Sequence, residues 1–283
     1  MNPLEKPLAS LSFSSNFLFV PGTRPERFSK ALDSGATAVV LDLEDAVPEE
    51  NKEEARNAIR SAWANFTDEQ KQRLVIRTNA PGSRFYSADL ILAQELNVPC
   101  ILIPKSESAD EVNGAALILP NTAIIPMIET ALGLDHLRDI ANSNQVIRLA
   151  LGNLDLQADL GMVCDQDETE LQTARYQIVL ASRLAQIAPP IDGVTPSTDD
   201  TARISNDAQR AKRMGFGAKL CIHPKQVSIV KAAFMPTDDE LAWAHRVIEA
   251  DHSKGGAVKL DGRMIDRPVV LLAQRTIALA GKH

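Results

Sequence analysis

The feature that most constrains the fold of this chain is a regular alternation of short apolar runs with longer stretches of helical periodicity. Uninterrupted apolar runs such as IIPMI (124–128) are typical of strands buried on both faces of a parallel sheet. Eight such runs follow one another, at residues 16–22, 37–45, 74–79, 100–105, 123–129, 147–153, 191–197 and 218–224. The intervening stretches predict helices at residues 49–64, 85–96, 107–119, 131–141, 169–188, 200–214 and 225–234.

Eight strand–helix alternations over about 235 residues predict an α/β fold in the form of a closed (β/α)8 TIM barrel. An open doubly wound sheet is the alternative. No GxGxxG or P-loop sequence follows the first run, which argues against a nucleotide-binding version of that sheet. Pro126 is an awkward residue for a strand interior, because it cannot donate a hydrogen bond to the ladder.

The alternation stops after residue 235, and the rest of the chain has a different pattern. The segment PTDDELAWAHRVIEADHSKGG predicts a helix that ends in a glycine pair, and AVKLDGRMIDRP predicts a short hairpin with Asp261-Gly262 at its turn. A last helix is expected at 268–281. We therefore predict a barrel domain over 1–235 and a C-terminal helix–hairpin–helix appendage over 236–283.

Composition and charge exclude several classes of partner. A net charge of −7 argues against nonspecific binding of nucleic acid. No apolar run approaches the roughly 20 residues that a membrane span needs, and the N-terminal segment has no pattern of a secretory signal. The cysteines Cys100, Cys164 and Cys221 form no CxxC pair and no even disulfide framework. We expect a cytoplasmic protein with reduced thiols and with neither nucleic acid nor membrane as a partner.

Polar residues are concentrated where the predicted strands end, which is where barrels of this kind carry their chemistry. These residues are Arg24, Glu44, Asp45, Arg77, Asn79, Lys105, Glu129, Asp155 and His223. Any one of them alone would be read as a cap or a loop residue. Their shared position predicts an active site at the C-terminal end of the barrel.

Glu129 and Asp155 follow strands that are consecutive along the chain, so the strands should be neighbours about 4.8 Å apart. Two carboxylates this close repel each other unless a proton or a cation lies between them. No His or Cys accompanies them at zinc-ligand spacing, and oxygen ligands suit Mg²⁺. Glu129 is thus predicted to be a metal ligand; the alternative is that it caps the helix starting near Thr130.

Seven segments occur in a characteristic order along nearly the whole chain: FLFVPGTRPERFSKAL, VVLDLEDAV, VIRTN, ILIPKSES, PMIETALGL, LALGNLDLQADLG and GFGAKLCIHPKQV. Together they resemble the citrate lyase β-subunit-like (CitE-like) aldolases of the HpcH/HpaI aldolase superfamily, and within these the CoA-specific malyl- and citramalyl-CoA lyases. The resemblance implies a Mg²⁺-dependent lyase, with Mn²⁺ as a substitute. Such an enzyme cleaves a 3-hydroxyacyl thioester to an α-keto acid and acetyl-CoA or a related acyl-CoA.

The resemblance also assigns roles to individual residues. Glu129 and Asp155 take the places of the family's metal ligands, and Arg77 that of its catalytic, substrate-binding arginine. Glu44 and Asp45 take the places of acids that surround the metal ligands without binding the ion. An ion pair between Arg77 and Glu44 alone is the structural alternative.

One motif departs from the family pattern, which is often GxEDL. This chain has Gly152-Asn153-Leu154-Asp155-Leu156, so that Leu154 replaces the acid before the metal-binding Asp. The ligand itself is retained, and the backbone amides of Gly152, Asn153 and Leu154 are expected to contact a substrate carboxylate. The departure therefore bears on substrate identity more than on metal binding.

The appendage supplies a candidate general acid for the enolate that cleavage would produce. Asp266 lies in GRMIDRP, and the CoA-specific lyases carry a catalytic Asp in a similar motif on a C-terminal lid. The resemblance further implies that this lid closes over a neighbouring subunit of a homo-oligomer, with a trimer favoured. His223 is an alternative acid, although a neutral histidine at a strand–helix junction is the preferred interpretation.

The identity of the acyl carrier is the main choice left open. The segment TRPERFSK offers Arg24, Arg27 and Lys30 for the phosphates of CoA, although solvated helix charges of this kind are common. The leading hypothesis is an acyl-CoA lyase. Its rivals are a citrate lyase β subunit acting on an acyl carrier protein within a complex, a metal-dependent aldolase acting on free keto acids, and a noncatalytic barrel.

Overall fold

The computed structural model describes residues 11–254 and 258–280. In these residues eight parallel strands form a closed barrel, each pairing with the next along the chain and β8 pairing with β1. The strands are β1 (Asn16–Pro21), β2 (Ala38–Asp42), β3 (Leu74–Arg77), β4 (Cys100–Ile103), β5 (Ala123–Ile128), β6 (Ala150–Leu151), β7 (Ile191–Asp192) and β8 (Ala218–Cys221). The predicted (β/α)8 barrel is confirmed, and the open sheet is excluded because β1 and β8 pair.

The apolar runs are strands because both of their faces are covered. Every residue of β2 and of β5 is buried, Pro126 included, and Pro126 pairs in register with Ile103 of β4. One set of strand side chains fills the interior of the barrel, including Phe17, Val40 and Ile125, and all of these are fully buried. The other set faces the helices.

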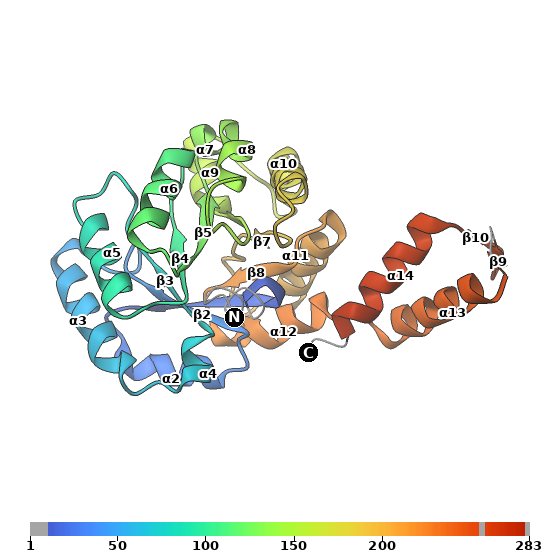
Figure 1. The fold of residues 1–283 in the computed structure, drawn as a ribbon, viewed down its shortest axis with the longest axis horizontal. Helices are drawn as coiled ribbons and strands as arrows, with labels where there is room; N and C mark the ends of the chain where they lie inside the picture. Colours follow the sequence, from blue (N-terminus) through green and yellow to red (C-terminus); the bar gives the residue numbers. More distant parts are fainter. Residues whose placement is uncertain (1–10, 255–257, 281–283) are drawn as a thin grey trace. The chain divides into compact units, whose positions relative to one another are not determined.

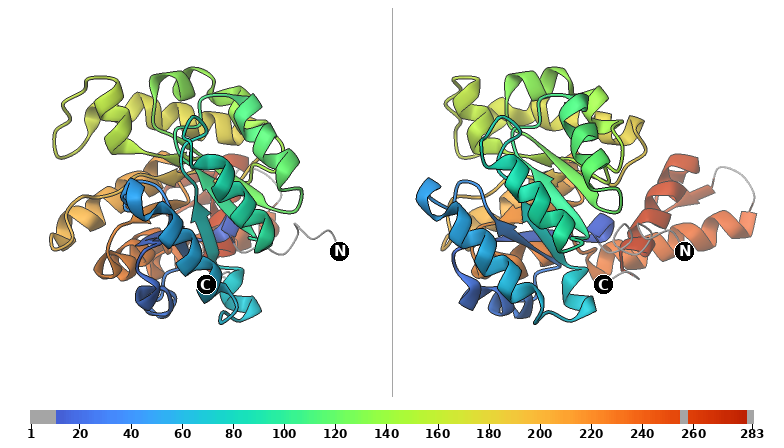
Figure 2. Two further views of the ribbon diagram at one scale, coloured as in Figure 1. Left: turned by 90° about the vertical axis from the view of Figure 1, so that its left-hand side faces the viewer. Right: turned by 60° about the vertical axis from the view of Figure 1, so that its left-hand side comes forward.

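Helices follow the strands in chain order around the outside of the barrel (Figures 1 and 2). They are α2 (Phe28–Asp33), α3 (Lys52–Trp63), α4 (Asp68–Lys71), α5 (Tyr86–Glu95), α6 (Ala109–Ile118), α7 (Ala131–Asp135), α8 (Leu137–Ala141), α9 (Asn153–Asp159), α10 (Gln172–Leu184), α11 (Thr201–Met214) and α12 (Pro224–Phe234). Short 3-10 turns η1 (Pro25–Arg27), η2 (Glu49–Asn51) and η3 (Thr169–Leu171) precede α2, α3 and α10. The helix predicted at 131–141 is two short helices, and α9 was not predicted.

Local signals set several helix starts. Ser108 and Glu111 form a capping box that satisfies free backbone amides at the start of α6. Thr130 accepts a hydrogen bond from the amide of Gly133 and so caps α7. The predicted alternative role of Glu129 as a cap is therefore taken by its neighbour Thr130.

The chain divides into two compact units, one ending at Lys231 and one beginning at Ala232. The second contains α13 (Asp238–Lys254), β9 (Val258–Leu260), β10 (Arg263–Ile265) and α14 (Arg267–Ala280). It has a core of its own, formed by Ala244, Val247, Ile265, Val270 and Ala273. No helix among the described residues is long and apolar enough to cross a membrane.

The hairpin of the second unit forms as predicted. Asp261 and Gly262 both have positive φ values, 48° and 80°, which is the backbone conformation of a type I′ turn. Leu260 and Arg263 pair directly across this turn. The glycine pair expected after α13, Gly255 and Gly256, lies outside the described residues, as does Gly281 at the predicted end of the last helix.

Candidate active site

The C-terminal ends of β2 and β3 bring an aspartate and an arginine into register. Asp42 is the last residue of β2 and pairs with Arg77, the last residue of β3. Arg77 donates from Nε and Nη2 to the two carboxylate oxygens of Asp42, each at 2.7 Å. This two-point geometry fixes the plane of the guanidinium, because neither bond can swing without breaking the other.

Two further acids and an aromatic ring surround the same guanidinium. Its Nη1 lies 2.8 Å from Glu44 and 3.6 Å from Asp45, and its carbon lies 4.7 Å from the ring centroid of Phe19. The Arg77 side chain is only 8% exposed. Burial disfavours the cation, but the charge and hydrogen bonds of Asp42 outweigh it, with Glu44 and Asp45 adding to them, so the pKa of Arg77 is raised. Arg77 is a fixed, permanent positive charge.

Glu44 joins this arginine to the lysine that follows β4. Its Oε1 accepts a hydrogen bond of 2.6 Å from Lys105 Nζ, while its Oε2 forms the ion pair with Arg77 without the alignment of a hydrogen bond. Burial raises the pKa of Glu44, and the nearby cations only partly offset that rise. Lys52 donates to the backbone carbonyls of Leu43 and Glu44, at 2.7 and 2.8 Å, and so fixes the loop that carries the acids.

Glu129 directly follows β5 and, like Asp42, is almost completely buried, at 1% exposure. Its Oε1 accepts a hydrogen bond of 2.7 Å from the backbone amide of Lys105, which has a left-handed φ of 46°. Gly152 lies against the same carboxylate: a Cβ on it would sit 2.1 Å from Glu129 Oε2, so the position admits only glycine. The pKa of Glu129 is raised to about 8, mainly by burial and then by the charges of Glu44 and Asp155, which outweigh the lowering by Lys105.

Asp155 lies in the first turn of α9, after β6, and is half-buried. β5 and β6 are paired neighbours, as predicted, with Ile128 opposite Leu151. The charge of Asp155 contributes to the raised pKa of Glu129, as expected of carboxylates that follow neighbouring strands. No group of three His, Cys, Asp or Glu side chains able to hold a metal occurs in the described parts of the chain. A cation here would have two protein ligands and take its other oxygens from water or substrate.

The balance of charge at these strand ends leaves room for such a cation. The charged groups are five acids and three cations: Asp42, Glu44, Asp45, Glu129 and Asp155, with Lys52, Arg77 and Lys105. With Glu129 ionised, five negative charges against three positive ones leave two negative charges. A divalent ion with oxygen ligands would neutralise them and would offset the burial and the like charges that raise the pKa of Glu129.

A cavity of about 360 Å³ opens beside these acids and is lined in part by Glu44, Asp45, Lys52, Asn79 and Phe85. Glu44 and Asp45 therefore face a space that a ligand can enter, whereas Glu129 and Asp155 do not line this cavity. A larger cavity of about 760 Å³ lies on the outside of the barrel, along α7, α8 and α10, and contains none of the predicted site residues.

The GNLDL segment, which departs from the family pattern, has one exposed and one buried side chain beside Asp155. The side chain of Leu154 is 46% exposed, next to Asp155. The side chain of Asn153 is buried and hydrogen-bonds Glu168 and the backbone of Val194. Any contact of Asn153 with substrate would therefore come from its backbone, as the sequence analysis expected of this segment.

The remaining predicted residues have local partners of their own. Arg24, Arg27 and Lys30 are exposed after β1, where the two arginines lie 3.8 Å from Glu26. His223 accepts a hydrogen bond of 3.2 Å from the amide of Lys225 at the start of α12, which fits a neutral histidine at a strand–helix junction. Asp266 belongs to the second unit, is exposed, and accepts a hydrogen bond of 3.3 Å from the amide of Val269 in α14.

Asp42 and Lys105 are functional residues that the strand-end pattern did not single out. Asp42 was not among the predicted site residues, although the alternation of side chains along a strand places it on the same face as Glu44. Lys105 was noted at a strand end but given no role. Its amide binds Glu129 and its ammonium binds Glu44, so one residue links both acids.

Comparison with known proteins identifies the family to which the chain belongs. Residues 16–224 match the HpcH/HpaI aldolase/citrate lyase family. The chain belongs to this family. It is 34% identical over 272 residues to a citrate lyase subunit beta-like protein of Mycobacterium tuberculosis, covering 94% of this chain and 95% of that one. It is 30% identical over 267 residues to a (3S)-malyl-CoA thioesterase of Cereibacter sphaeroides, covering 93% of each.

Solved structures of family members extend the similarity to the whole fold. The CitE protein of Mycobacterium tuberculosis, in complex with magnesium, acetoacetate and coenzyme A, matches with a TM-score of 0.85 and 33% identity, over 95% of this chain and 99% of that one. The citrate lyase beta subunit from the same organism, with oxaloacetate and magnesium, matches with a TM-score of 0.71 and 31% identity, over 83% and 100%. The chain is thus an enzyme of the oxo-acid lyase type, as the motifs indicated.

Proposed function

We propose that this enzyme is a Mg²⁺-dependent carbon–carbon lyase that cleaves a 3-hydroxyacyl-CoA of the malyl-CoA or citramalyl-CoA type. The products would be an α-keto acid and acetyl-CoA or a related acyl-CoA. The observation that carries the proposal is the paired carboxylates of Glu129 and Asp155, which lie at the same end of the barrel as the fixed cation of Arg77. The relatives that contain magnesium with keto acids or coenzyme A support it.

Glu129 and Asp155 would hold the metal, because their two carboxylates lie at neighbouring strand ends and repel each other without a cation. Bound Mg²⁺ supplies Lewis-acid stabilisation of an alkoxide and a fixed orientation for a substrate that chelates it. The protein's own part is to hold both ligands still. Gly152 and the amide of Lys105 do this for Glu129 from two sides.

Arg77 would stabilise the negative charge that develops on the thioester oxygen as the bond breaks. Its position cannot adjust, since Asp42 binds it at two points and Glu44 at a third. A preorganised charge of this kind stabilises the transition state more than the ground state, because the enolate charge exists only after bond cleavage has begun.

Asp266 would supply the proton that converts the enolate into the acyl-CoA methyl group. In its own unit its side chain caps α14, and its exposure leaves the carboxyl accessible to a substrate. We propose that the second unit acts as a lid, over a neighbouring subunit's site in a homo-oligomer, with a trimer favoured. Arg24, Arg27 and Lys30 would meet the phosphates of CoA.

The carrier is the point at which rival functions diverge. The main rival is a citrate lyase β subunit acting on an acyl carrier protein, and one relative is a citrate lyase subunit beta. Another relative is a (3S)-malyl-CoA thioesterase and a solved relative contains coenzyme A, which supports CoA here. Thioester hydrolysis would release free CoA instead of an acyl-CoA. The thiols of Cys100, Cys164 and Cys221 are free, which fits the cytoplasmic location we propose.

The test is a panel assay of malyl-, citramalyl- and citryl-CoA with Mg²⁺, following both the keto acid and free CoA. Release of a keto acid without free CoA supports the lyase, and loss of activity with chelator supports the metal. Free CoA as the main product would favour the thioesterase. Turnover only of citryl-acyl carrier protein would favour the citrate lyase subunit.

A further inference from the structure

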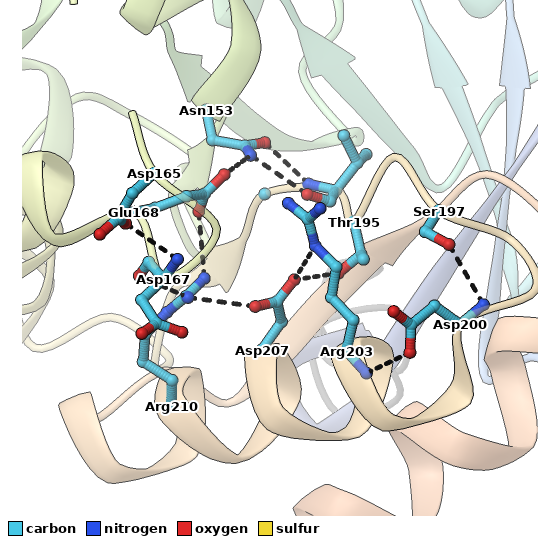
Figure 3. A network of polar contacts seen from close by, with 12 residues as sticks. Asn153, Asp165, Asp167, Glu168, Thr195, Ser197, Asp200, Arg203, Asp207 and Arg210 are labelled. Carbon is cyan, nitrogen blue, oxygen red and sulfur yellow. Dashed lines mark hydrogen bonds and ion pairs between the residues drawn. The ribbon is translucent and has the colours of Figure 1, made fainter. Parts of the chain in front are cut away.

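We propose that Asn153 is a positioning residue for Asp155, and that Glu168 holds Asn153 in the orientation this requires. The inference deepens the proposed function and rests on it, since it concerns the metal ligand named there. It is carried by a buried polar network behind the first turn of α9 (Figure 3).

The carboxamide of Asn153 continues the barrel where its strands stop pairing. β6 and β7 are two residues long each and share a single pair, Ala150 with Ile191. Beyond it, Asn153 Oδ1 accepts a hydrogen bond of 2.8 Å from the amide of Val194, and its Nδ2 donates to the carbonyl of the same residue at 3.1 Å. The side chain thus replaces a rung of the ladder and fixes the start of α9 against the end of β7.

Two glycines allow the backbone to pack closely against Glu129 and Asn153. A Cβ on Gly193 would lie 2.0 Å from Asn153 Oδ1, just as one on Gly152 would collide with Glu129. Glu129, Gly152, Asn153 and Gly193 are therefore packed side by side across the ends of β5, β6 and β7. Displacing Asn153 moves the backbone that leads from Gly152 to Asp155.

Glu168 fixes which way the carboxamide faces. Its Oε1 accepts a hydrogen bond of 2.8 Å from Asn153 Nδ2, and Figure 3 shows the two side chains pointing toward each other. Its Oε2 pairs with the fully buried Arg175 and, at 3.0 Å, with Arg210. Glu168 is itself buried and has a left-handed φ of 49°, a backbone conformation that costs a non-glycine residue free energy.

The network around Glu168 is bonded to residues of β7 and β8. Arg175 donates to Asp192 at the end of β7 at 2.8 Å, and Lys219 of β8 donates to the carbonyl of Gly193 at 2.7 Å. The Glu168 carboxylate is therefore held by cations that the barrel itself fixes. Groups that hydrogen-bond a metal ligand fix its geometry, and their loss typically weakens metal binding about 10- to 100-fold. Asn153 and Glu168 act on Asp155 through the backbone of its own helical turn, so we expect an effect near the lower end of that range.

The experiment compares Mn²⁺ binding by calorimetry in the full-length wild type and five variants, each first shown to be folded by circular dichroism. Asn153→Asp keeps the acceptor for Val194 but places a carboxylate against Glu168. Its added negative charge should by itself tighten cation binding, so a loss can come only from displaced ligands. We expect a loss of about 10-fold or more for this variant and for Glu168→Gln.

The double variant N153D/E168Q restores one donor and one acceptor at the contact and leaves the net charge unchanged, so it should recover part of the affinity. The control Glu170→Gln removes an exposed acid two residues away and should stay within about twofold of wild type, since exposed charges act weakly. If Asn153→Asp does not fold, Glu168→Gln is compared with Glu170→Gln, which removes an equal charge nearby, and only a loss of affinity beyond that of the control supports the positioning role.

The positioning role is wrong if Asn153→Asp or Glu168→Gln is folded and binds Mn²⁺ as tightly as wild type. That outcome leaves the proposed function standing, provided that wild type binds Mn²⁺ and Glu129→Gln does not. A wild type that fails to bind Mn²⁺, or a Glu129→Gln variant that binds it equally well, overturns the proposed metal site and the positioning role with it.

Discussion

The buried carboxylate of Glu129 should make the metal-free enzyme less stable as the pH rises. Its pKa is raised from 4.5 to about 8 in the folded protein, so the folded state binds a proton more tightly than the unfolded state. Stability from this group is therefore complete at low pH and is lost as the pH rises from about 4.5 towards 8. This direction is opposite to that of an acid whose pKa is lowered by a salt bridge.

The magnitude follows from the two pKa values. One pKa unit corresponds to about 1.4 kcal/mol, so the interval between pH 5 and pH 8 is worth about 3 kcal/mol for a single group with this shift. Glu129→Gln removes the titration while its amide oxygen can still accept the hydrogen bond from the Lys105 amide. We expect the variant to be more stable than wild type at pH 8 in chelator, and nearly equal to it at pH 5.

The assay is thermal unfolding of both proteins in chelator across this pH range. For a domain of this size about 3 kcal/mol corresponds to roughly 6–12 °C in Tm. Taking the difference between the two proteins cancels the other titrating groups. Added Mg²⁺ should then stabilise wild type and leave the variant unchanged, because only wild type binds it. A Tm difference that does not change between pH 5 and pH 8 would refute the reasoning.

The other predictions concern catalysis. Arg77→Lys should lower kcat/KM by orders of magnitude, because a point ammonium cannot make the two-point contact of the planar fork, and near-normal steady-state kinetics would make the arginine structural. Asp155→Asn should weaken Mn²⁺ binding in calorimetry, and full activity of wild type in excess chelator would contradict the metal's role. Lys105→Gly should relieve the left-handed backbone and keep the amide bond to Glu129 while removing the ammonium, so we expect an equal or higher Tm with at least about tenfold lower kcat/KM. Mixing inactive Asp266→Asn and Glu129→Gln proteins, with subunit exchange demonstrated, should restore part of the activity; no recovery would mean that Asp266 acts within its own chain or not at all.

The barrel could be predicted from the sequence because the alternation of an apolar run with a helical stretch occurs eight times, and each apolar run can be recognised without the others. The site was predicted in part, for a related reason. Glu129, Asp155, Arg77 and Glu44 each follow an apolar run, and parallel strands bring such positions to one end without any knowledge of register. The ends of helices and the split of 131–141 at His136 depend on single backbone angles, which no periodicity encodes.

What the sequence did not show is decided by register and by long-range contacts. LDLED offers acids at 42, 44 and 45, and only the pairing of Asp42 with Arg77 shows which of them receives the two-point bond. Alternation along the strand could have indicated it, because Asp42 and Glu44 lie on one face and Leu43 on the other.

Asn153 shows the same limit more sharply. Its partners Glu168 and Val194 lie 15 and 41 residues away along the chain, and Glu168 reaches it only from a left-handed turn. In the sequence these are a polar residue after a strand, an acid in a loop and an apolar residue, none of them distinctive. They become informative only when β6 and β7 stop pairing and leave a backbone amide and carbonyl that something must satisfy. The motifs place the ligands, and unpaired backbone groups behind them determine which further residues hold those ligands still.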